Sequence, residues 1–307
     1  MPHAAKPPDH RVDSPKPGGC LTVPRIDDSH VPMPDSIPLV TVRPLAGSAA
    51  EDLFNGLVHW ELWGRLGWLE VKRRYRRTVL GPFWSGISYG LFVGAFGIVG
   101  SGVLRQSAGA FTPFLAAGML VWLLISAMVS EAGHVFVATS NVLRQIRLNY
   151  SILVYALVWR NLLVFLHNLV IFLVVLLLAS NQRPTLAMLL AIPGLFLLLL
   201  NGTWLTLLLG LLCTRFRDMQ QVAINVLQIF MFITPIFWSP DLLAGTSREL
   251  IVRFNPIYYL IDIVRTPLLS GVPAPRSYEV VLAITVLGWI ATLMAFRRFR
   301  GRIPYWA

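Results

Sequence analysis

Long apolar stretches with few or no charged residues dominate the chain from residue 82 onward. They cover residues 82–104, 111–130, 152–180, 185–213, 219–238 and 278–296. Because a helix rises about 1.5 Å per residue, each stretch is long enough to cross the roughly 30 Å hydrocarbon core of a bilayer. The pattern predicts six transmembrane helices.

A different pattern precedes these stretches, between residues 50 and 78. Apolar and aromatic residues recur there at helical spacing, with basic residues between them. The recurring positions are Leu53, Leu57, Trp60, Trp63, Leu66, Leu69 and Tyr75. An amphipathic helix rich in Trp and Arg is typical of a membrane interface. A soluble helix packed on a domain core is the alternative, but the chain shows no other soluble domain, so we expect an amphipathic interface helix over residues 50–78.

Between the fifth and sixth apolar stretches lies a segment of mixed character, residues 239–275. Its apolar part, residues 256–270, begins at a proline and is interrupted by Asp262 and Arg265. This part is too short and too charged to span a bilayer. We expect a pair of re-entrant or interfacial helices here.

Composition supports the same class of protein. Hydrophobic residues make up 55% of the 307 residues and charged residues 13%, whereas an average soluble domain carries about 25% charged residues. The mean hydropathy is +0.64. The sequence therefore predicts an all-α integral membrane protein, with a transmembrane domain of six helices over residues 79–307.

The net charge of +11 is first a statement about topology, because cytoplasmic loops of membrane proteins are enriched in Lys and Arg. With six crossings, most basic residues fall on the side that holds both termini. These residues lie at 72–77, 144–147, 215–217 and 297–302. We expect a multi-pass protein of the cytoplasmic (inner) membrane with both termini in the cytoplasm.

The first 49 residues have a composition of their own, rich in Pro, Asp, Ser and Gly and without the apolar core of a signal peptide. This composition predicts a disordered cytoplasmic tail over residues 1–49. The two cysteines, Cys20 and Cys213, lie far apart and in no metal-binding spacing. Neither a disulfide nor a metal site is expected.

Signatures of catalysis are absent from the sequence. The only lysines are Lys6, Lys16 and Lys72, and none stands in a GxxxxGK(S/T) phosphate-binding loop. HExxH and GxSxG are missing, and no paired carboxylates occur within the apolar stretches. We expect no catalytic residue, metal or cofactor in this chain. A membrane enzyme is disfavoured rather than excluded, because some glycosyl ligases use few ionisable groups.

The third apolar stretch contains polar residues that need an explanation, since Arg at the centre of a membrane helix costs about 2.5–3.5 kcal/mol. Arg160, His167 and Asn168 share one helical face. In one interpretation this polar stripe faces a conduit or an anionic headgroup. In the other, Arg160 reaches the cytoplasmic interface while His167 and Asn168 bond between helices. Glu131, near the end of the second stretch, is a candidate partner of Arg160.

Aromatic residues are frequent in the apolar stretches. Rings that line a channel stack on sugars, and the candidates for this role are Trp84, Tyr89, Phe92 and Trp122. For any single ring, packing against lipid or an interface belt is the more ordinary interpretation.

The segment 138–151 is a short polar connection on the predicted cytoplasmic side, with Asn141, Arg144 and Arg147 at intervals of three. A short helix along the membrane that receives force from a partner is one interpretation. An ordinary positively charged cytoplasmic loop is the other, and the residues alone favour it.

Several blocks in a fixed order resemble one family. They are "VKRRYRRTVLGPFWSGIS", "FTPFLAAGMLVWLLIS", "NVLRQIRLNYSILVYALVWRNLLVFLHNLV" and "FNPIYYLIDIVRTPLLSG". They resemble the permease subunits of ABC polysaccharide exporters of the O-antigen (lipopolysaccharide) type, and the resemblance covers about residues 50–300. Many members of that family have Pro after the cytoplasmic loop, where this chain has Asn149 and Tyr150.

The resemblance implies a half-transporter for a polyprenyl-diphosphate-linked glycan. Two copies would form a channel, and two separate ATPase subunits would supply ATP hydrolysis with Mg²⁺. Residues 50–78, with Trp63 and Arg65, would form the interface helix that contacts the ATPase. Residues 141–149 would form the coupling helix, and residues 242–270 the external gate helices.

The basic cluster before the first apolar stretch gains a second possible role from this resemblance. Arg73, Arg74, Arg76 and Arg77 are placed to meet a lipid-diphosphate headgroup, and the guanidinium fork suits phosphate oxygens. The alternative is a topology anchor attracted to the lipid surface, worth about 1 kcal/mol per basic residue. At the level of function, the alternatives are an ABC exporter of another lipid or small molecule, and a membrane glycosyltransferase or ligase.

Overall fold

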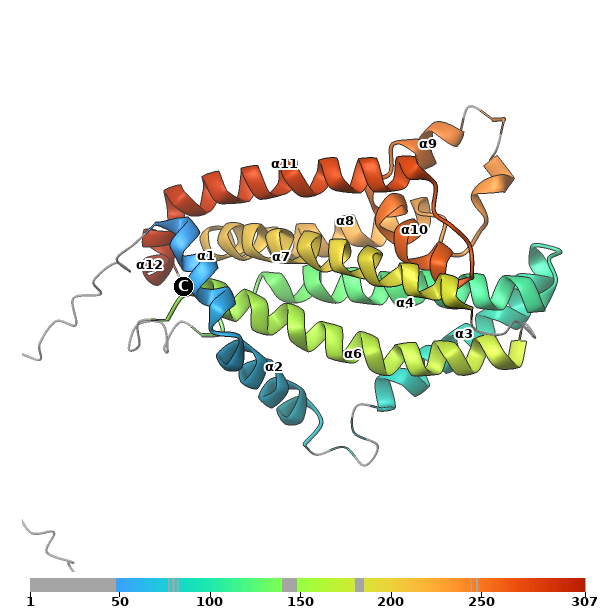
Figure 1. Ribbon diagram of the computed structural model, residues 1–307, viewed down its shortest axis with the longest axis horizontal. Coiled ribbons are helices and arrows are strands. Elements are labelled where there is room, and N and C mark those ends of the chain that lie inside the picture. Colours follow the sequence, from blue (N-terminus) through green and yellow to red (C-terminus); the bar gives the residue numbers. More distant parts are fainter. Residues whose placement is uncertain are drawn as a thin grey trace, which may run out of the picture. The chain divides into compact units, whose positions relative to one another are not determined.

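The computed structural model describes residues 48–76, 78, 81, 83–139, 148–179, 185–243, 245–246 and 248–306. Every regular element in this part of the chain is a helix (Figure 1). The predicted all-α class is therefore confirmed. The predicted tail lies outside the described residues except for Ser48 and Ala49, which begin the first helix.

Five helical segments are long and apolar enough to cross a membrane. They are α3 (Phe83–Val103), α4 (Ala108–Ala132), α6 (Tyr150–Ala179), η2 (Leu186–Leu190) continued by α7 (Ala191–Arg215), and α11 (Pro275–Phe299) continued by η4 (Arg300–Arg302) and α12 (Ile303–Trp306). These segments match five of the six predicted spans. The described residues thus form a multi-pass membrane protein.

The remaining predicted span, residues 219–238, is shorter than expected. The helix α8 (Met219–Ile233) has 15 residues and ends at Thr234, whose backbone is extended (φ −77°, ψ 133°). Pro235 explains this end, because proline disfavours the helical conformation of the residue before it. At about 1.5 Å per residue, α8 alone is shorter than the hydrocarbon core of a bilayer.

The predicted single helix over residues 50–78 is wrong, because the structure contains two helices there, α1 (Ala49–Val58) and α2 (Trp60–Arg74). Ser48 and Glu51 form a capping box that starts α1. His59 then breaks the helix (φ −80°, ψ 49°), and its Nδ1 lies 2.6 Å from the carbonyl oxygen of Asn55. The contact of the His59 ring with the preceding turn ends α1 here. The periodicity of the apolar residues alone predicts that the helix continues.

The core is centred on α4, which packs against α3, α6, α7, α8 and α10. Its fully buried side chains include Phe111, Leu115 and Leu120. On α6, Phe172 and Leu176 are equally buried. Burial on several sides explains why α4 reads as apolar all round, without the polar face that a surface helix would show.

The segment after α8 returns to the helix bundle. It contains η3 (Pro240–Leu243), α9 (Glu249–Arg253) and α10 (Pro256–Leu268). The helix α10 packs against α4, α7, α11 and η2, and it matches the apolar part predicted at residues 256–270. Asn255 caps it, since the side chain accepts hydrogen bonds from the backbone N–H groups of Ile257 and Tyr258.

Arg265 fixes the same helix at a second point. Its Nη1 donates to the carbonyl oxygen of Pro235 at 2.7 Å, and its guanidinium carbon lies 4.3 Å from the centroid of the Phe114 ring. Asn255 also donates to the hydroxyl of Thr234 at 2.8 Å. Both ends of α10 are therefore bonded to the break that follows α8.

The two ends of the described chain lie at the same end of the bundle, where α1 and α12 are found in Figure 1. Arg300 donates from Nη1 to the carbonyl oxygen of Ser48 at 2.7 Å. This bond joins the start of α1 to η4 near the end of the described chain.

Candidate functional site

The helix α2 passes close to α6 at Gly67. A Cβ atom there would lie 2.8 Å from the carbonyl oxygen of Ala156 and 2.9 Å from Cδ1 of Trp159. Only glycine permits this contact without displacement of the α6 backbone. Positions three and four residues apart share a helical face, so Glu70 and Arg74 continue the face of α2 that Gly67 turns toward α6.

Four charged residues meet where this face passes the end of α4. The guanidinium of Arg160 contacts the Glu70 carboxylate and donates from Nη2 to Oε2 of Glu131 at 2.6 Å. Arg74 donates from Nη2 to Oε1 of Glu131 at 2.8 Å. We call Glu70, Arg74, Glu131 and Arg160 the four-charge cluster. The pairing of Glu131 with Arg160, expected from sequence, is confirmed.

The net charge of the cluster is zero. Two carboxylates and two guanidiniums alternate along it, and Asn161 adds a hydrogen bond from Nδ2 to Oε2 of Glu131 at 2.9 Å. The side chains of Arg160 and Glu131 are 17% and 21% exposed. Burial alone would lower the pKa of Arg74, but the hydrogen bond and charge of Glu131 outweigh it and raise that pKa.

A cavity of about 260 Å³ opens beside the cluster. Its polar lining is Glu70, Glu131, Arg160, His134 and Thr139. Apolar residues from the chain after α4 and from the first turns of α6 complete it, namely Val135, Ala138, Leu153 and Leu157.

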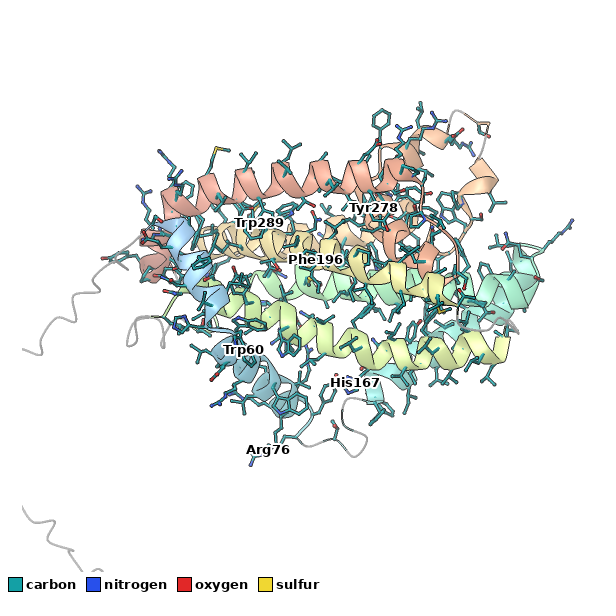
Figure 2. All side chains as sticks on the ribbon, in the orientation of Figure 1. Trp60, Arg76, His167, Phe196, Tyr278 and Trp289 are labelled. Carbon is teal, nitrogen blue, oxygen red and sulfur yellow. The ribbon has the colours of Figure 1, made fainter. Side chains whose placement is uncertain are left out.

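The predicted headgroup arginines fall into two groups. Arg74 belongs to the four-charge cluster, whereas Arg73 and Arg76 are exposed and form no ion pair within the described residues. Figure 2 shows Arg76 beyond the end of α2, pointing away from the helix bundle. Arg77 lies outside the described residues. A role in headgroup binding stays a prediction for all four.

The predicted polar stripe of α6 is divided among different neighbours. Arg160 belongs to the four-charge cluster. The Nδ1 of His167 lies 2.7 Å from the carbonyl oxygen of Leu163, and its ring meets Phe83 edge-on at 6.0 Å. Asn168 is buried, and its Oδ1 has no hydrogen-bond partner among the described residues. Whether any of them faces a conduit stays a prediction.

The four predicted channel aromatics also separate into two kinds. Tyr89 and Trp122 belong to the buried core, and the Tyr89 hydroxyl donates to the carbonyl oxygen of Ala116 at 2.8 Å. Trp84 and Phe92 are exposed on α3. Phe92 stacks on Phe96 with ring centroids 5.8 Å apart. Only the exposed pair is accessible from outside this chain.

The residues predicted to couple to an ATPase lie partly within the described structure. Trp63 faces α6, where its ring lies 6.3 Å from Tyr155 and 5.9 Å from Trp159. Arg65 is exposed and lies 3.9 Å from Glu61. Asn141, Arg144 and Arg147 lie outside the described residues. Their coupling role stays a prediction.

Sequence reasoning missed Glu70 and Asp52, and helical periodicity carries a signal for both. Glu70 follows Trp63 and Gly67 on the buried face of α2. Asp52 shares a face with Gly56, whose Cβ would meet the Ser151 side chain. Asp52 Oδ1 accepts a hydrogen bond from the Ser151 backbone N–H at 3.1 Å, at the start of α6. Burial raises the pKa of Asp52, although the Ser151 hydrogen bonds and the charge of Arg300 oppose the increase.

Long apolar helices, a partly buried charge cluster of zero net charge and a basic helix before the first span define a polytopic membrane protein. Comparison with known proteins makes the class specific. The family description "ABC-2 type transporter" matches residues 61–269, well over half of the chain. The chain therefore belongs to the ABC-2 type transporter family, as a transport subunit and not an enzyme. The match runs from α2 to α10 and includes the whole four-charge cluster.

Individual proteins similar to this chain are named as transport permeases, in agreement with the family match. The chain is 29% identical over 194 residues to the O-antigen export system permease protein RfbA of Myxococcus xanthus, covering 62% of this chain and 74% of that protein. It is 22% identical over 231 residues to a protein of the same name from Klebsiella pneumoniae, covering 75% and 87%.

Proposed function

We propose that this chain is the channel-forming permease subunit of an ABC transporter. It exports a polyprenyl-diphosphate-linked polysaccharide of the O-antigen kind across the cytoplasmic membrane. The observation that carries the proposal is the similarity to permeases of O-antigen export over 74% and 87% of their lengths.

A separate ATPase supplies the energy in this proposal. The chain has no GxxxxGK(S/T) loop, so ATP and Mg²⁺ belong to a partner. The partner contacts α1, α2 and the segment 141–149. The exposed side chains of Trp60, Arg65 and Trp68 on α2 support this proposal, because they leave one face of the helix uncovered within the chain.

The proposed topology has six crossings with both termini in the cytoplasm. The sixth crossing is α8 extended by the irregular residues 234–238, and α10 is a re-entrant gate helix on the external side. The contact of Arg300 with Ser48 supports an even number of crossings. The arginines near residues 72–77 and 297–302 support the cytoplasmic assignment of that end.

The proposed channel needs a second copy of the chain. Large apolar side chains stand exposed along α3 and α8, including Leu91, Ile98, Val226 and Phe232. In a membrane such faces meet lipid or another helix. We assign α3, with Trp84 and Phe92, and α8 to the faces that meet the partner copy and the glycan.

A deletion strain tests the function. Without the chain, polyprenyl-diphosphate-linked glycan should accumulate on the cytoplasmic side of the inner membrane, while its synthesis continues. Re-expression of the chain should return the glycan to the cell surface. Normal surface glycan in the deletion strain, or loss of a different exported lipid, would contradict the proposal.

A further inference from the structure

We propose that the four-charge cluster is a joint that makes α2 and the end of α4 move as one body, with Glu131 and Arg160 as positioning residues for transport. This inference rests on the proposed function, in which α2 and the segment after α4 contact the ATPase. It assigns the connection between those two contacts to specific atoms.

The geometry of α2 supports the joint. Glu70 and Arg74 lie four positions apart, where a Glu and an Arg on one helix ordinarily pair with each other. Here they diverge: Glu70 binds Arg160 on α6, and Arg74 binds Glu131 on α4. Arg160 closes the connection at Glu131. Three helices are thus held by one alternating series of charges.

The cluster lies close to the connection between α4 and α6. Glu131 is the penultimate residue of α4, immediately before the connection that leads to residues 140–147. Arg160 lies on the returning helix, about two helical turns before His167, which contacts the first residue of α3. The cluster therefore joins the two arms of the connection between α4 and α6, that is, the end of α4 and the first three turns of α6.

A cavity lies beside the cluster and reduces the packing between the helices there. The cavity of about 260 Å³ lies between the two arms, lined by Val135 and Ala138 on one side and Leu153 and Leu157 on the other. Across this space the described side chains that line it do not pack against one another, so they make fewer dispersion contacts there. The ion pairs are directional, because guanidinium and carboxylate match as forks. They oppose relative movement of the arms together with apolar packing such as the edge contact of Phe136 with Tyr150.

The choice of variants follows from the zero net charge of the cluster. Removal of one member leaves an uncompensated, partly buried charge. That charge alone destabilises the fold, whether or not the cluster acts as a joint. Removal of all four leaves none. The informative variant is therefore Glu70→Gln, Arg74→Gln, Glu131→Gln and Arg160→Gln combined. The matched control for the exchange measurement is Glu61→Gln with Arg65→Gln, because this pair lies on the same helix but is exposed and 3.9 Å apart. It does not serve for export, because Arg65 is assigned to the ATPase contact.

Two measurements on the full-length chain in native membranes decide the proposal. The first is hydrogen–deuterium exchange of the α2 amides, which should quicken by roughly tenfold or more in the quadruple variant and stay unchanged in the control. The second is export per ATP hydrolysed, which should fall by a similar factor while ATP hydrolysis and membrane insertion persist.

A variant in which the acidic and basic residues of the cluster are exchanged should restore the function lost in the quadruple Gln variant. Glu70→Arg, Arg74→Glu, Glu131→Arg and Arg160→Glu together restore the alternation of charge, so slow exchange and coupled export should largely return. Unchanged α2 exchange in the quadruple variant overturns the joint, and normal export with fast exchange overturns its role in transport. If the unmodified chain exports no glycan, the proposed function fails instead, while the exchange measurement still decides whether the joint exists.

Discussion

At the scale of single residues, one missing side chain sets the position of α2. Gly67 allows the backbone of α2 to meet the carbonyl oxygen of Ala156, and a Cβ would approach this oxygen to 2.8 Å. Backbone atoms cannot move aside as the tip of a flexible side chain can. The approach of Glu70 and Arg74 to their partners therefore depends on a residue without a side chain at the crossing.

The replacement Gly67→Ala should destabilise the chain by about 1–3 kcal/mol, the usual effect of overpacking. The midpoint of thermal unfolding in detergent measures it. Gly64→Ala is the matched control, since a Cβ at Gly64 meets no atom within 4 Å. There the higher helix propensity of Ala should stabilise by up to about 1 kcal/mol. Equal effects of the two substitutions would contradict the crossing at Gly67.

The exposed arginines offer a second test at this scale. If Arg73 and Arg76 bind the lipid-diphosphate headgroup, the double variant Arg73→Gln, Arg76→Gln should lower export by about tenfold, since hydrogen bonds to charged groups contribute about 1.5–3 kcal/mol. Glycan export in cells with equal inserted protein measures this. Lys72→Gln, which removes another exposed basic side chain of α2, is the control. Normal export by the double variant would leave these arginines a topological role only.

At the scale of elements, much of the fold follows from the sequence. Five spans lie where the apolar stretches place them, because twenty or so uncharged residues have few alternatives to a membrane helix. The break at His59 and the end of α8 at Thr234 depend on local backbone bonds and on Pro235, which hydropathy does not detect. The pair of Glu131 and Arg160 was predictable as two charges near one membrane interface. The participation of Glu70 and Arg74 was not, since it requires the position of α2 on α6.

The capping of α10 leads to a prediction about the same break. Asn255→Ala removes the cap of α10 and the bond to Thr234, so it should destabilise the chain by about 1–2 kcal/mol. Thr234→Ala removes only the bond between the two elements, and about 1 kcal/mol is expected. Unfolding midpoints in detergent compare the two. A larger effect of Thr234→Ala would show that the cap contributes little.

The contact of α1 with α6 should depend on pH. The pKa of Asp52 is raised above its ordinary value of 3.8, so protonation favours the folded state. The stabilisation is complete below the ordinary pKa and is lost as the pH rises through the raised pKa. Amide exchange of α1 should therefore slow, relative to the intrinsic rate, as the pH falls toward 4. Asp52→Asn should abolish this dependence, and its persistence in the variant would assign it to another group.

At the scale of the whole molecule, the chain is a multi-pass membrane protein of the ABC-2 type transporter family. Its sequence lacks a nucleotide-binding loop, and exposed apolar faces run along α3, α8 and α11. Its family match covers α2 to α10. These properties agree with a permease that works with a second copy and an ATPase.

Transport by inverted inner-membrane vesicles shows whether this chain moves lipid-linked glycan across the membrane. Vesicles from cells that contain the chain and its ATPase should move radiolabelled lipid-linked glycan into the lumen, out of reach of an added glycosidase, only when ATP is supplied. Vesicles from the deletion strain should leave the glycan fully digestible. ATP-dependent protection that is equal in both kinds of vesicle would contradict the claim that this chain carries the glycan across the membrane.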